Sequence, residues 1–392
     1  MRIWIFSLES VETRYTCEWR HSIPVGIQEE ANNQGRRARF LYSPLLDRRD
    51  VASDGNIFIN EVEIAQLEGT GSNQVTTPGA FLNFAGTNVW KSSQLALFCE
   101  ALSKGLVKRG DKVLFADAWN PVILQVKYMN DLLGLGLEIH SIWHAGSYDP
   151  QDFLGRLIKD KRWTISSEKA MFFAYNYNYF ATEFYINLFF SNLFYEQDHK
   201  EAYKANQDRV VLSGQPHQYM KKRIEEYTKS PKEDIVLFPH RVAPEKQPDI
   251  FRDLAKSFPH YEFIVCQDQK LSKEEYHNLL LKSKIVFSAN LQETLGISAM
   301  EAILAGSTPL VPDRLSYSEM YMDQFKYPSE WTKSWEDYLD NKKHLVRLIQ
   351  DTVNLYNKPE THMKNIEKQK LKLDDYLSAG VMFKKLLNFK DV

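Results

Sequence analysis

The stretch from residue 284 to residue 312 constrains the fold of this chain most, because it is typical of a strand, a loop, a helix and a second strand in close succession. Residues 285–287 are a β-branched and aromatic run, and residues 297–304 are rich in helix formers. Gly306 stands where a helix ends, and residues 309–311 begin the next strand. The succession predicts an α/β fold with parallel strands.

The loop of this stretch, residues 290–296, leads from a strand into a helix N-terminus. The first amides of a helix are unpaired and lie at its positive end, so such a loop favours an anionic ligand. Glu293 and Glu301 flank the turn with seven residues between them, and carboxylates accept hydrogen bonds from hydroxyls. Together these features favour a nucleotide sugar as ligand. An ordinary surface helix with acidic residues in its first turns is the alternative.

A second motif lies about fifty residues upstream, where a run of strand type (residues 235–238) is followed by Arg241 and Lys246. An arginine offers a planar fork of donors and a lysine a point charge. As a pair they are suited to neutralise a leaving diphosphate.

These two motifs resemble the signature of retaining glycosyltransferases of the two-Rossmann (GT-B) fold, family-four type. Glu293 and Glu301 match its E-x7-E pattern, and Arg241 and Lys246 match its Arg-x4-Lys pair. The resemblance implies an α/β fold with two Rossmann-like domains facing across a cleft, and a C-terminal helix that crosses back to the first domain.

A chain of 392 residues is too long for one core, which also indicates two domains. We expect an acceptor-binding Rossmann-like domain over residues 1–215 and a nucleotide-sugar-binding domain over residues 216–375. The helix that returns to the first domain is expected within residues 376–392.

The resemblance also implies roles for single residues. The catalytic residues would be His144, Glu293, Arg241 and Lys246. The donor, with a UDP-sugar favoured, would be bound by Arg241, Lys246, Gln267, Glu293, Thr294, Leu295, Gly296 and Glu301. No Asp-x-Asp metal motif is present in the sequence, so we expect neither a metal nor a bound cofactor, and the nucleotide sugar is a co-substrate.

Three strands are expected in the N-terminal half, at residues 3–6, 112–116 and 138–143, and polar residues follow each of them. Ligands of α/β folds bind at the carboxyl ends of parallel strands, so these residues are the predicted acceptor site. They are Glu12, Thr13, Arg14, Asp117, Trp119, His144, Ser147 and Tyr148. Two alternatives stay open: residues 12–14 cap the following helix, and His144 is a buried structural histidine.

Helices are expected at residues 23–33, 92–108 and 375–387. Residues 36–42 are expected to form a strand that carries a cluster of arginines, with Arg48 and Arg49 after it. Residues 171–195 are strongly aromatic. Core packing is the default interpretation of this stretch, and stacking on bases or sugars is the alternative for its exposed members.

Composition excludes several classes of protein. No run of about 18 apolar residues exists, so no membrane span is expected, and no signal-peptide core is apparent. Cys17, Cys99 and Cys266 show neither metal spacing nor a disulfide framework, which favours a cytoplasmic protein. The formal net charge of −2 supplies no global attraction to nucleic acid or to anionic membranes.

The N-terminal half is similar to phage-encoded glycosyltransferases, some of which modify hydroxymethylated pyrimidines in DNA. This resemblance implies transfer of glucose or arabinose to 5-hydroxymethylcytosine in double-stranded DNA, in the cytoplasm of the host. Such a reaction would need the base to be flipped into a pocket. The alternatives are a glycan, lipid-linked or small-molecule acceptor, or a protein that binds sugar nucleotides without catalysis. The oligomeric state does not follow from the sequence.

Overall fold

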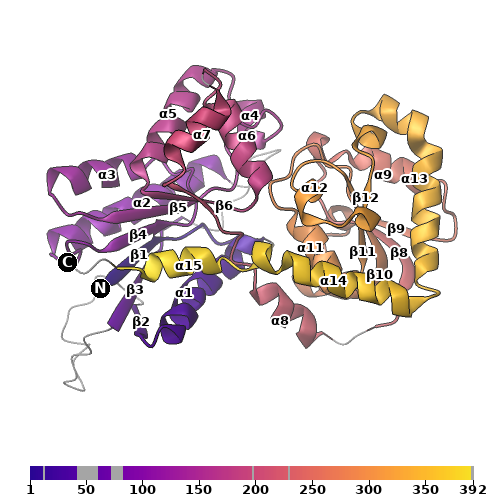
Figure 1. Cartoon of the computed structure of the whole chain (residues 1–392), viewed down its shortest axis with the longest axis horizontal. Coiled ribbons are helices and arrows are strands. Elements are labelled where there is room, and N and C mark those ends of the chain that lie inside the picture. Colours follow the sequence, from indigo (N-terminus) through magenta and orange to yellow (C-terminus); the bar gives the residue numbers. More distant parts are fainter. Residues whose placement is uncertain (12–13, 42–60, 72–82, 197, 228–229, 390–392) are drawn as a thin grey trace. The chain divides into compact units, whose positions relative to one another are not determined.

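The computed structural model describes residues 1–11, 14–41, 61–71, 83–196, 198–227 and 230–389, and the chain divides into two α/β units (Figure 1). Unit 1 comprises Met1–Ala181, Ile186–His217 and Ser378–Val392. Unit 2 comprises Thr182–Tyr185 and Gln218–Leu377. Each unit has its own parallel sheet.

The sheet of unit 1 has seven parallel strands in the order β2-β3-β1-β4-β5-β6-β7. Its strands are β1 (Arg2–Phe6), β2 (Arg37–Leu41), β3 (Glu61–Leu67), β4 (Lys112–Phe115), β5 (Glu138–Ile142), β6 (Tyr177–Phe180) and β7 (Val210–Leu212). Strands β2 and β3 lie on one side of β1, and β4 to β7 lie on the other. The strand order therefore reverses between β1 and β4, the kind of position where α/β sheets bind ligands.

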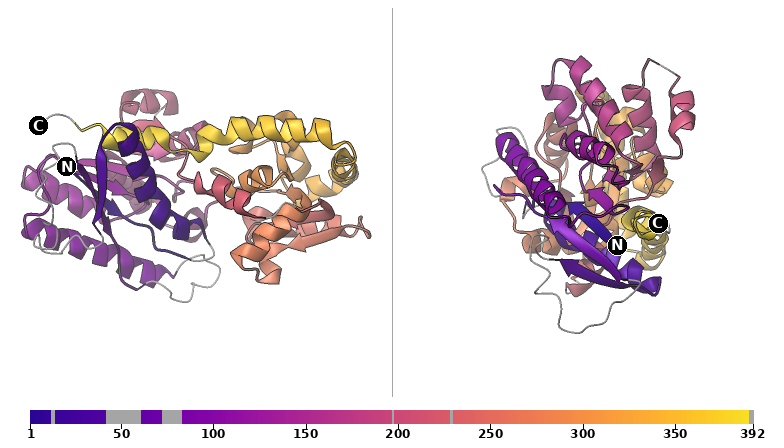
Figure 2. Two further views of the ribbon diagram at one scale, coloured as in Figure 1. Left: turned by 90° about the horizontal axis from the view of Figure 1, so that it is seen from below. Right: turned by 90° about the vertical axis from the view of Figure 1, so that its left-hand side faces the viewer.

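Helices cover both faces of this sheet. They are α1 (Tyr15–Asn33), α2 (Phe84–Ser103), α3 (Ile123–Leu132), α4 (Phe153–Leu157), α5 (Lys161–Ala174), α6 (Glu183–Leu193), α7 (His199–Asn206) and α15 (Gly380–Leu387). Figures 1 and 2 show α1 and α15 side by side on one face, while α2, α3 and α5 lie on the other. The arrangement follows from right-handed crossovers, since the chain leaves β1 in one direction and β4 in the opposite direction.

The aromatic stretch of residues 171–195 lies mainly in the core of unit 1. Eight of its aromatic side chains are buried: Phe172, Tyr175, Tyr179, Phe180, Tyr185, Phe189, Phe190 and Phe194. Phe189 is central among them, because its ring contacts Trp143, Tyr148, Phe172 and Phe180 at centroid distances of 4.8 to 5.3 Å. Only Phe173 and Tyr195 are large exposed members. Core packing is thus the observed role of most of this stretch.

The sheet of unit 2 has five parallel strands in the order β12-β11-β10-β8-β9. Its strands are β8 (Glu233–Phe238), β9 (Glu262–Val265), β10 (Ser283–Phe287), β11 (Thr308–Pro312) and β12 (Lys326–Tyr327). The chain runs from β8 to β9 on one side and then returns past β8 to β10. The order reverses between β8 and β10, which are direct neighbours.

Helices also cover both faces of the second sheet. Helix α11 (Ile297–Leu304) contacts α8 (Tyr219–Glu226), α10 (Lys273–Lys282) and α14 (Pro359–Leu377). Helices α9 (Pro248–Ala255) and α13 (Trp335–Leu355) contact each other and close a core with the strands that includes Phe238, Phe251 and Phe287. Short elements complete the unit: η2 (Pro244–Lys246), η3 (Cys266–Gln269), α12 (Tyr317–Met320), η4 (Asp323–Phe325) and η5 (Ser329–Thr332).

Three predicted helix boundaries are wrong. Helix α1 begins at Tyr15, eight residues before the expected start at residue 23, and carries the buried Pro24 inside it. Helix α2 spans Phe84–Ser103 and not residues 92–108, because the side chain of Asn83 caps it by accepting from the Gly86 amide. The helix expected at residues 375–387 is two helices, α14 and α15, separated at residues 378–379.

The C-terminal segment belongs to unit 1, although the helix before it belongs to unit 2. Helix α15 packs on α1, and Arg36 donates to the Leu387 carbonyl at 2.6 Å. Lys112 donates to the carbonyls of Lys385 and Asn388. Two units with parallel sheets and a returning C-terminal helix confirm the predicted fold class. Among the residues described, no helix is long and apolar enough to cross a membrane.

Candidate functional site

The carboxyl ends of β8 and β10 bring together the residues of the two motifs in unit 2. The loop after β8 carries Arg241 and continues into η2, which ends at Lys246. The loop after β10 carries Glu293 and ends at α11. The amide of Leu291 donates to the Glu245 carbonyl at 2.8 Å, so the two loops are joined directly. The site lies where ligands of open α/β sheets bind.

Lys246 is the buried cation of this site. Its side chain is 7% exposed. The ammonium donates to the Gln292 carbonyl at 2.5 Å and lies 3.4 Å from Oε2 of Glu293. The buried ammonium thus joins η2 to the loop after β10.

Glu293 takes the amides that were expected to bind an anion. Its Oε1 accepts from the Thr294 amide at 3.1 Å and from the Leu295 amide at 3.5 Å, and its Oε2 accepts from Asn290 Nδ2 at 3.3 Å. Burial alone would raise the pKa of this carboxyl, but Lys246 and the amides lower it below its ordinary value. Glu293 is therefore an ionised carboxylate in a site built for negative charge.

Gly296 makes the turn into α11 possible. Its φ of 79° lies in the left-handed region, where a side chain is disfavoured. A Cβ at this position would lie 2.6 Å from Cε1 of Tyr317. Tyr317 is fully buried and its hydroxyl accepts a hydrogen bond from Asn290 at 3.0 Å. The glycine thus keeps the loop close to the tyrosine that supports it.

Arg241 and Gln267 lie on the β9 side of the same loop. Arg241 Nη2 donates to Glu245 at 3.1 Å, and its side chain is 37% exposed, so much of the guanidinium faces solvent. The side-chain oxygen of Gln267 accepts from the Val242 amide at 2.5 Å. Gln267, which was expected to bind the donor, fixes the loop that carries Arg241.

Glu301 lies in the second turn of α11 and faces α10. Tyr276 donates to its Oε2 at 2.8 Å, and His277 Nε2 lies 3.7 Å from its Oε1. The side chain is 17% exposed. Its oxygens can accept further hydrogen bonds, because each carboxylate oxygen accepts more than one.

Residues 313–319, which follow β11, were expected to border the donor pocket, but no role was predicted for Arg314 itself. Its guanidinium donates to the carbonyls of Ala289, Asn290, Ser329 and Thr332 at 2.7 to 3.1 Å. It thereby fixes the backbone from which Glu293 projects. No local pattern could reveal this role, since four carbonyls from two loops meet only in the folded unit.

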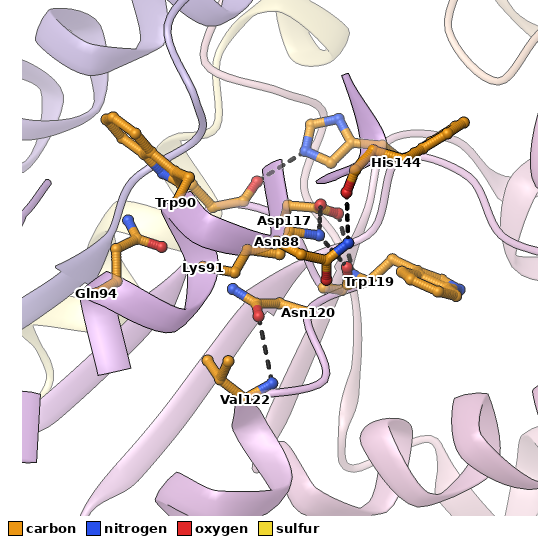
Figure 3. Close-up of polar contacts among 12 residues, drawn as sticks. Asn88, Trp90, Lys91, Gln94, Asp117, Trp119, Asn120, Val122 and His144 are labelled. Atoms are coloured by element: carbon orange, nitrogen blue, oxygen red, sulfur yellow. Dashed lines mark hydrogen bonds and ion pairs between the residues drawn. The ribbon is translucent and has the colours of Figure 1, made fainter. Parts of the chain in front are cut away.

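In unit 1, Asp117 forms the centre of a polar group at the end of β4 (Figure 3). Its Oδ2 lies 3.2 Å from Nζ of Lys91, which also donates to the Trp119 carbonyl at 2.6 Å. Its Oδ1 accepts from the Trp119 amide at 3.0 Å. Lys91 was missed because the predicted helix began at residue 92. The group lies at the strand-order reversal between β1 and β4.

His144, at the end of β5, is held by two hydrogen bonds. Its Nε2 donates to the Ala116 carbonyl at 2.7 Å, so its Nδ1 accepts from the Tyr15 hydroxyl at 3.0 Å. Burial lowers the pKa of the ring. These contacts match the structural alternative that the sequence left open, and its catalytic role stays a prediction.

Ser147 and Tyr148 are buried and do not join Asp117 at the surface of the unit. The hydroxyl of Ser147 donates to Glu168 at 2.9 Å, and Trp119 Nε1 donates to the same carboxylate at 2.7 Å. Burial raises the pKa of Glu168, which is fully enclosed. No local pattern marks Glu168 as part of this group, because it lies in the middle of α5.

The first predicted acceptor residues are only partly described. Glu12 and Thr13 lie outside the described residues. Arg14 is the residue before α1, with a φ of −123° and a ψ of 161°, and its guanidinium lies 5.7 Å from the ring centroid of Tyr15. Its position at the helix start agrees with the capping alternative, although its side chain makes no cap hydrogen bond.

Two α/β units with parallel sheets, a returning C-terminal helix and polar loops at both strand-order reversals define the GT-B fold. No protein-family model matches the chain. The structure is similar to sucrose-phosphate synthase from Thermosynechococcus elongatus over 98% of both chains, with 12% identity and a TM-score of 0.56. It is also similar to the catalytic domain of starch synthase IV from Arabidopsis thaliana, bound to ADP and acarbose, over 98% of both chains, with 13% identity and a TM-score of 0.52.

The chain is shorter than another structure that it matches. It spans 58% of the length of TarM, which covers 76% of this chain at 15% identity and a TM-score of 0.47.

Proposed function

We propose that this protein is a glycosyltransferase that moves a sugar from a nucleoside-diphosphate sugar to an acceptor hydroxyl. The observation that carries the proposal is the cluster of Arg241, Lys246 and Glu293 at the carboxyl ends of β8 and β10. It offers two cations to a diphosphate and a carboxylate to sugar hydroxyls. The shared fold adds support, since the starch synthase of this fold was solved with ADP.

In the proposed reaction, the bond between the anomeric carbon and the diphosphate breaks and the acceptor oxygen bonds to that carbon. Lys246 and Arg241 stabilise the charge that develops on the leaving diphosphate. Glu293 and the amides of residues 294–296 hold the sugar hydroxyls. The acceptor proton passes to the leaving diphosphate on the same face, which retains the anomeric configuration as the resemblance implies.

The nucleoside part of the donor is assigned to Glu301 and to the loop after β8 that Gln267 fixes. Glu301 would accept hydrogen bonds from the ribose hydroxyls, and the loop that Gln267 fixes would border the base. A UDP-sugar is the favoured donor, on the resemblance of the two motifs.

Unit 1 is assigned to the acceptor, with Asp117, Trp119, Lys91 and His144 as its polar residues. The finer proposal, a 5-hydroxymethylcytosine in DNA, rests on the resemblance of the N-terminal half. Two sequence features are compatible with a DNA acceptor, the aromatic stretch and the cluster of arginines, and the structure gives both of them other contacts. Most aromatics of residues 171–195 are core, and Arg39 lies 2.8 Å from Glu63 in an ion pair. Arg48 and Arg49 lie outside the described residues.

The activity is tested by incubating the purified protein with UDP-, ADP- and GDP-sugars and measuring release of the nucleoside diphosphate with and without acceptors. Arg241→Ala should lower the rate by roughly 100-fold, because one donor to the developing charge is lost. Arg347→Ala is the matched control, since this arginine on α13 is 84% exposed and pairs only within its helix turn among the residues described. Equal rates in wild type and Arg241→Ala would contradict the proposal.

The acceptor is tested separately by nucleoside mass spectrometry of hydroxymethylcytosine DNA after incubation with the active donor. A mass gain of one sugar on the modified base supports the DNA proposal. Transfer to glycans, lipids or small molecules without any gain on DNA would overturn it. Donor binding without turnover on any acceptor would instead favour a non-catalytic sugar-nucleotide-binding protein.

A further inference from the structure

His240 directly precedes Arg241 in the loop after β8, and the proposed function gives it no role. The residue is 6% exposed. Its ring stands nearly perpendicular to that of Phe238, with centroids 5.1 Å apart. The side chain is thus enclosed at the base of the loop that carries the proposed diphosphate-binding cations.

One ring nitrogen of His240 is bonded and the other is not. The Phe287 carbonyl, at the end of the neighbouring strand β10, accepts a hydrogen bond from the imidazole. Nε2 is buried and has no hydrogen-bond partner in the described part of the chain. The bond to Phe287 is therefore made through Nδ1, which leaves the lone pair of Nε2 as the free acceptor.

The charges that act on His240 are those of the proposed donor site. Burial has the largest effect on its pKa and Lys246 adds to it, while Glu293 opposes them; together they lower it to about 3. Arg241 acts in the same direction as Lys246. The imidazole is neutral at physiological pH, so Nε2 accepts hydrogen bonds and does not donate them.

An unpartnered buried acceptor is unfavourable, and an apolar side chain would fill the same space without that penalty. A diphosphate cannot satisfy Nε2, because its ionised oxygens carry no hydrogen to donate. A hydroxyl can. Of the hydroxyls in a nucleotide sugar, those near Lys246 and Glu293 belong to the transferred sugar, whereas Glu301 is assigned to the ribose.

We propose that Nε2 of His240 accepts a hydrogen bond from one hydroxyl of the transferred sugar and makes the site selective for sugars that carry it. The inference rests on the proposed function. It makes His240 a specificity-determining residue that recognises the glycosyl group and not the nucleoside diphosphate.

The test compares the affinity for a nucleotide sugar with that for its nucleoside diphosphate, using UDP-glucose with UDP first and the corresponding ADP- and GDP-sugar pairs next. His240→Leu removes the acceptor, so it should weaken binding of the nucleotide sugar by about 10- to 100-fold and change nucleoside diphosphate binding by less than about twofold. His240→Gln offers an amide oxygen and should restore part of the loss.

His362→Leu is the control for losing a buried histidine elsewhere in unit 2. This histidine is 4% exposed and its Nε2 lies 2.9 Å from Oγ1 of Thr308, away from the donor loops. His362→Leu should change the affinity for the nucleotide sugar and the affinity for the nucleoside diphosphate by the same factor.

Donor analogues that lack one sugar hydroxyl identify the group that Nε2 binds. Wild type should bind the analogue that lacks this hydroxyl more weakly than the intact donor. The His240→Leu protein should bind the analogue and the intact donor equally well. Equal losses for the sugar and the diphosphate, or no coupling at any hydroxyl, would overturn the inference. If wild type binds none of the nucleotide sugars, the proposed function itself fails.

A nitrogen-15 NMR measurement serves if His240→Leu does not fold. In wild type, the resonance of the unprotonated Nε2 should shift when the nucleotide sugar binds, because the nitrogen then accepts a hydrogen bond. It should shift much less with the nucleoside diphosphate. An Nε2 resonance that is the same in both complexes would contradict the inference.

Discussion

At the scale of single residues, the proposed donor site is a set of paired charges. Lys246 pairs with Glu293, and Glu293 occupies the amides of Thr294 and Leu295. A diphosphate sugar can replace these contacts with equivalent ones. The proximity of Lys246 and Glu293 was predictable from the sequence, since their types and spacing match a known pair of motifs. The roles of Arg314 and His240 were not, because they depend on backbone carbonyls from other loops.

Replacing the carboxylate tests this arrangement. Glu293→Gln keeps the shape of the side chain but removes its charge, so it should lower kcat/KM by roughly 100-fold. Steady-state kinetics with the active donor measure the effect. Glu330→Gln, an exposed residue of η5, is the control. A Glu293→Gln protein with wild-type kcat/KM would exclude this role.

Arg314, which is half-buried in the loop after β11, should matter for stability. Arg314→Lys keeps a charge but loses the fork that binds four carbonyls, so unit 2 should lose about 2–4 kcal/mol of unfolding free energy. Urea unfolding monitored by tryptophan fluorescence measures it, with Arg347→Lys on α13 as the control. Coincident urea curves for Arg314→Lys and wild type would show that these bonds are dispensable.

At the scale of elements, strands were predicted better than helix starts. The strand expected at residues 285–287 lies within β10, and the helix expected at residues 297–304 coincides with α11. Both were predictable because apolar runs and helix formers are local signals. The start of α1 was missed because no cap side chain marks it and Pro24 interrupts the pattern. The loop before α11 was expected to favour an anion, and the carboxylate of Glu293 itself folds over its amides.

The turn into α11 provides an element-scale prediction. Gly296→Ala places a Cβ in a left-handed backbone and against Tyr317, so it should destabilise unit 2 by about 2–3 kcal/mol and weaken donor binding. Gly306→Ala is the matched control. Its φ is 75°, yet the nearest side-chain atom to a Cβ there is 3.6 Å away. If the two variants lose equal stability, the contact with Tyr317 contributes nothing.

At the scale of the whole molecule, the chain builds two sheets and returns its last residues to the first unit. The return could be predicted only from the resemblance, because residues 378–389 carry no signal for their partner. The structure supplies the reason. Lys112 is 2% exposed, lies 2.6 Å from Glu138 and donates to two carbonyls around the end of α15.

The ion pair between Lys112 and Glu138 predicts that the stability of unit 1 depends on pH. Burial alone would raise the pKa of Glu138, but hydrogen bonds from His140 and Lys112 lower it below 4.5. Its stabilising effect is therefore present above pH 4.5 and is lost as the pH falls toward its folded pKa. The urea midpoint should decrease between pH 5.5 and pH 3.5, and Glu138→Gln should decrease less. Parallel decreases in both proteins would contradict this assignment.

A crystal structure with UDP, or with whichever nucleoside diphosphate binds best in the donor panel, would show directly whether Lys246 and Arg241 bind the diphosphate. We expect phosphate oxygens within hydrogen-bond distance of Lys246 Nζ and the Arg241 guanidinium, at the carboxyl ends of β8 and β10. A nucleotide bound elsewhere, with Lys246 still on the Gln292 carbonyl and Glu293, would contradict this expectation.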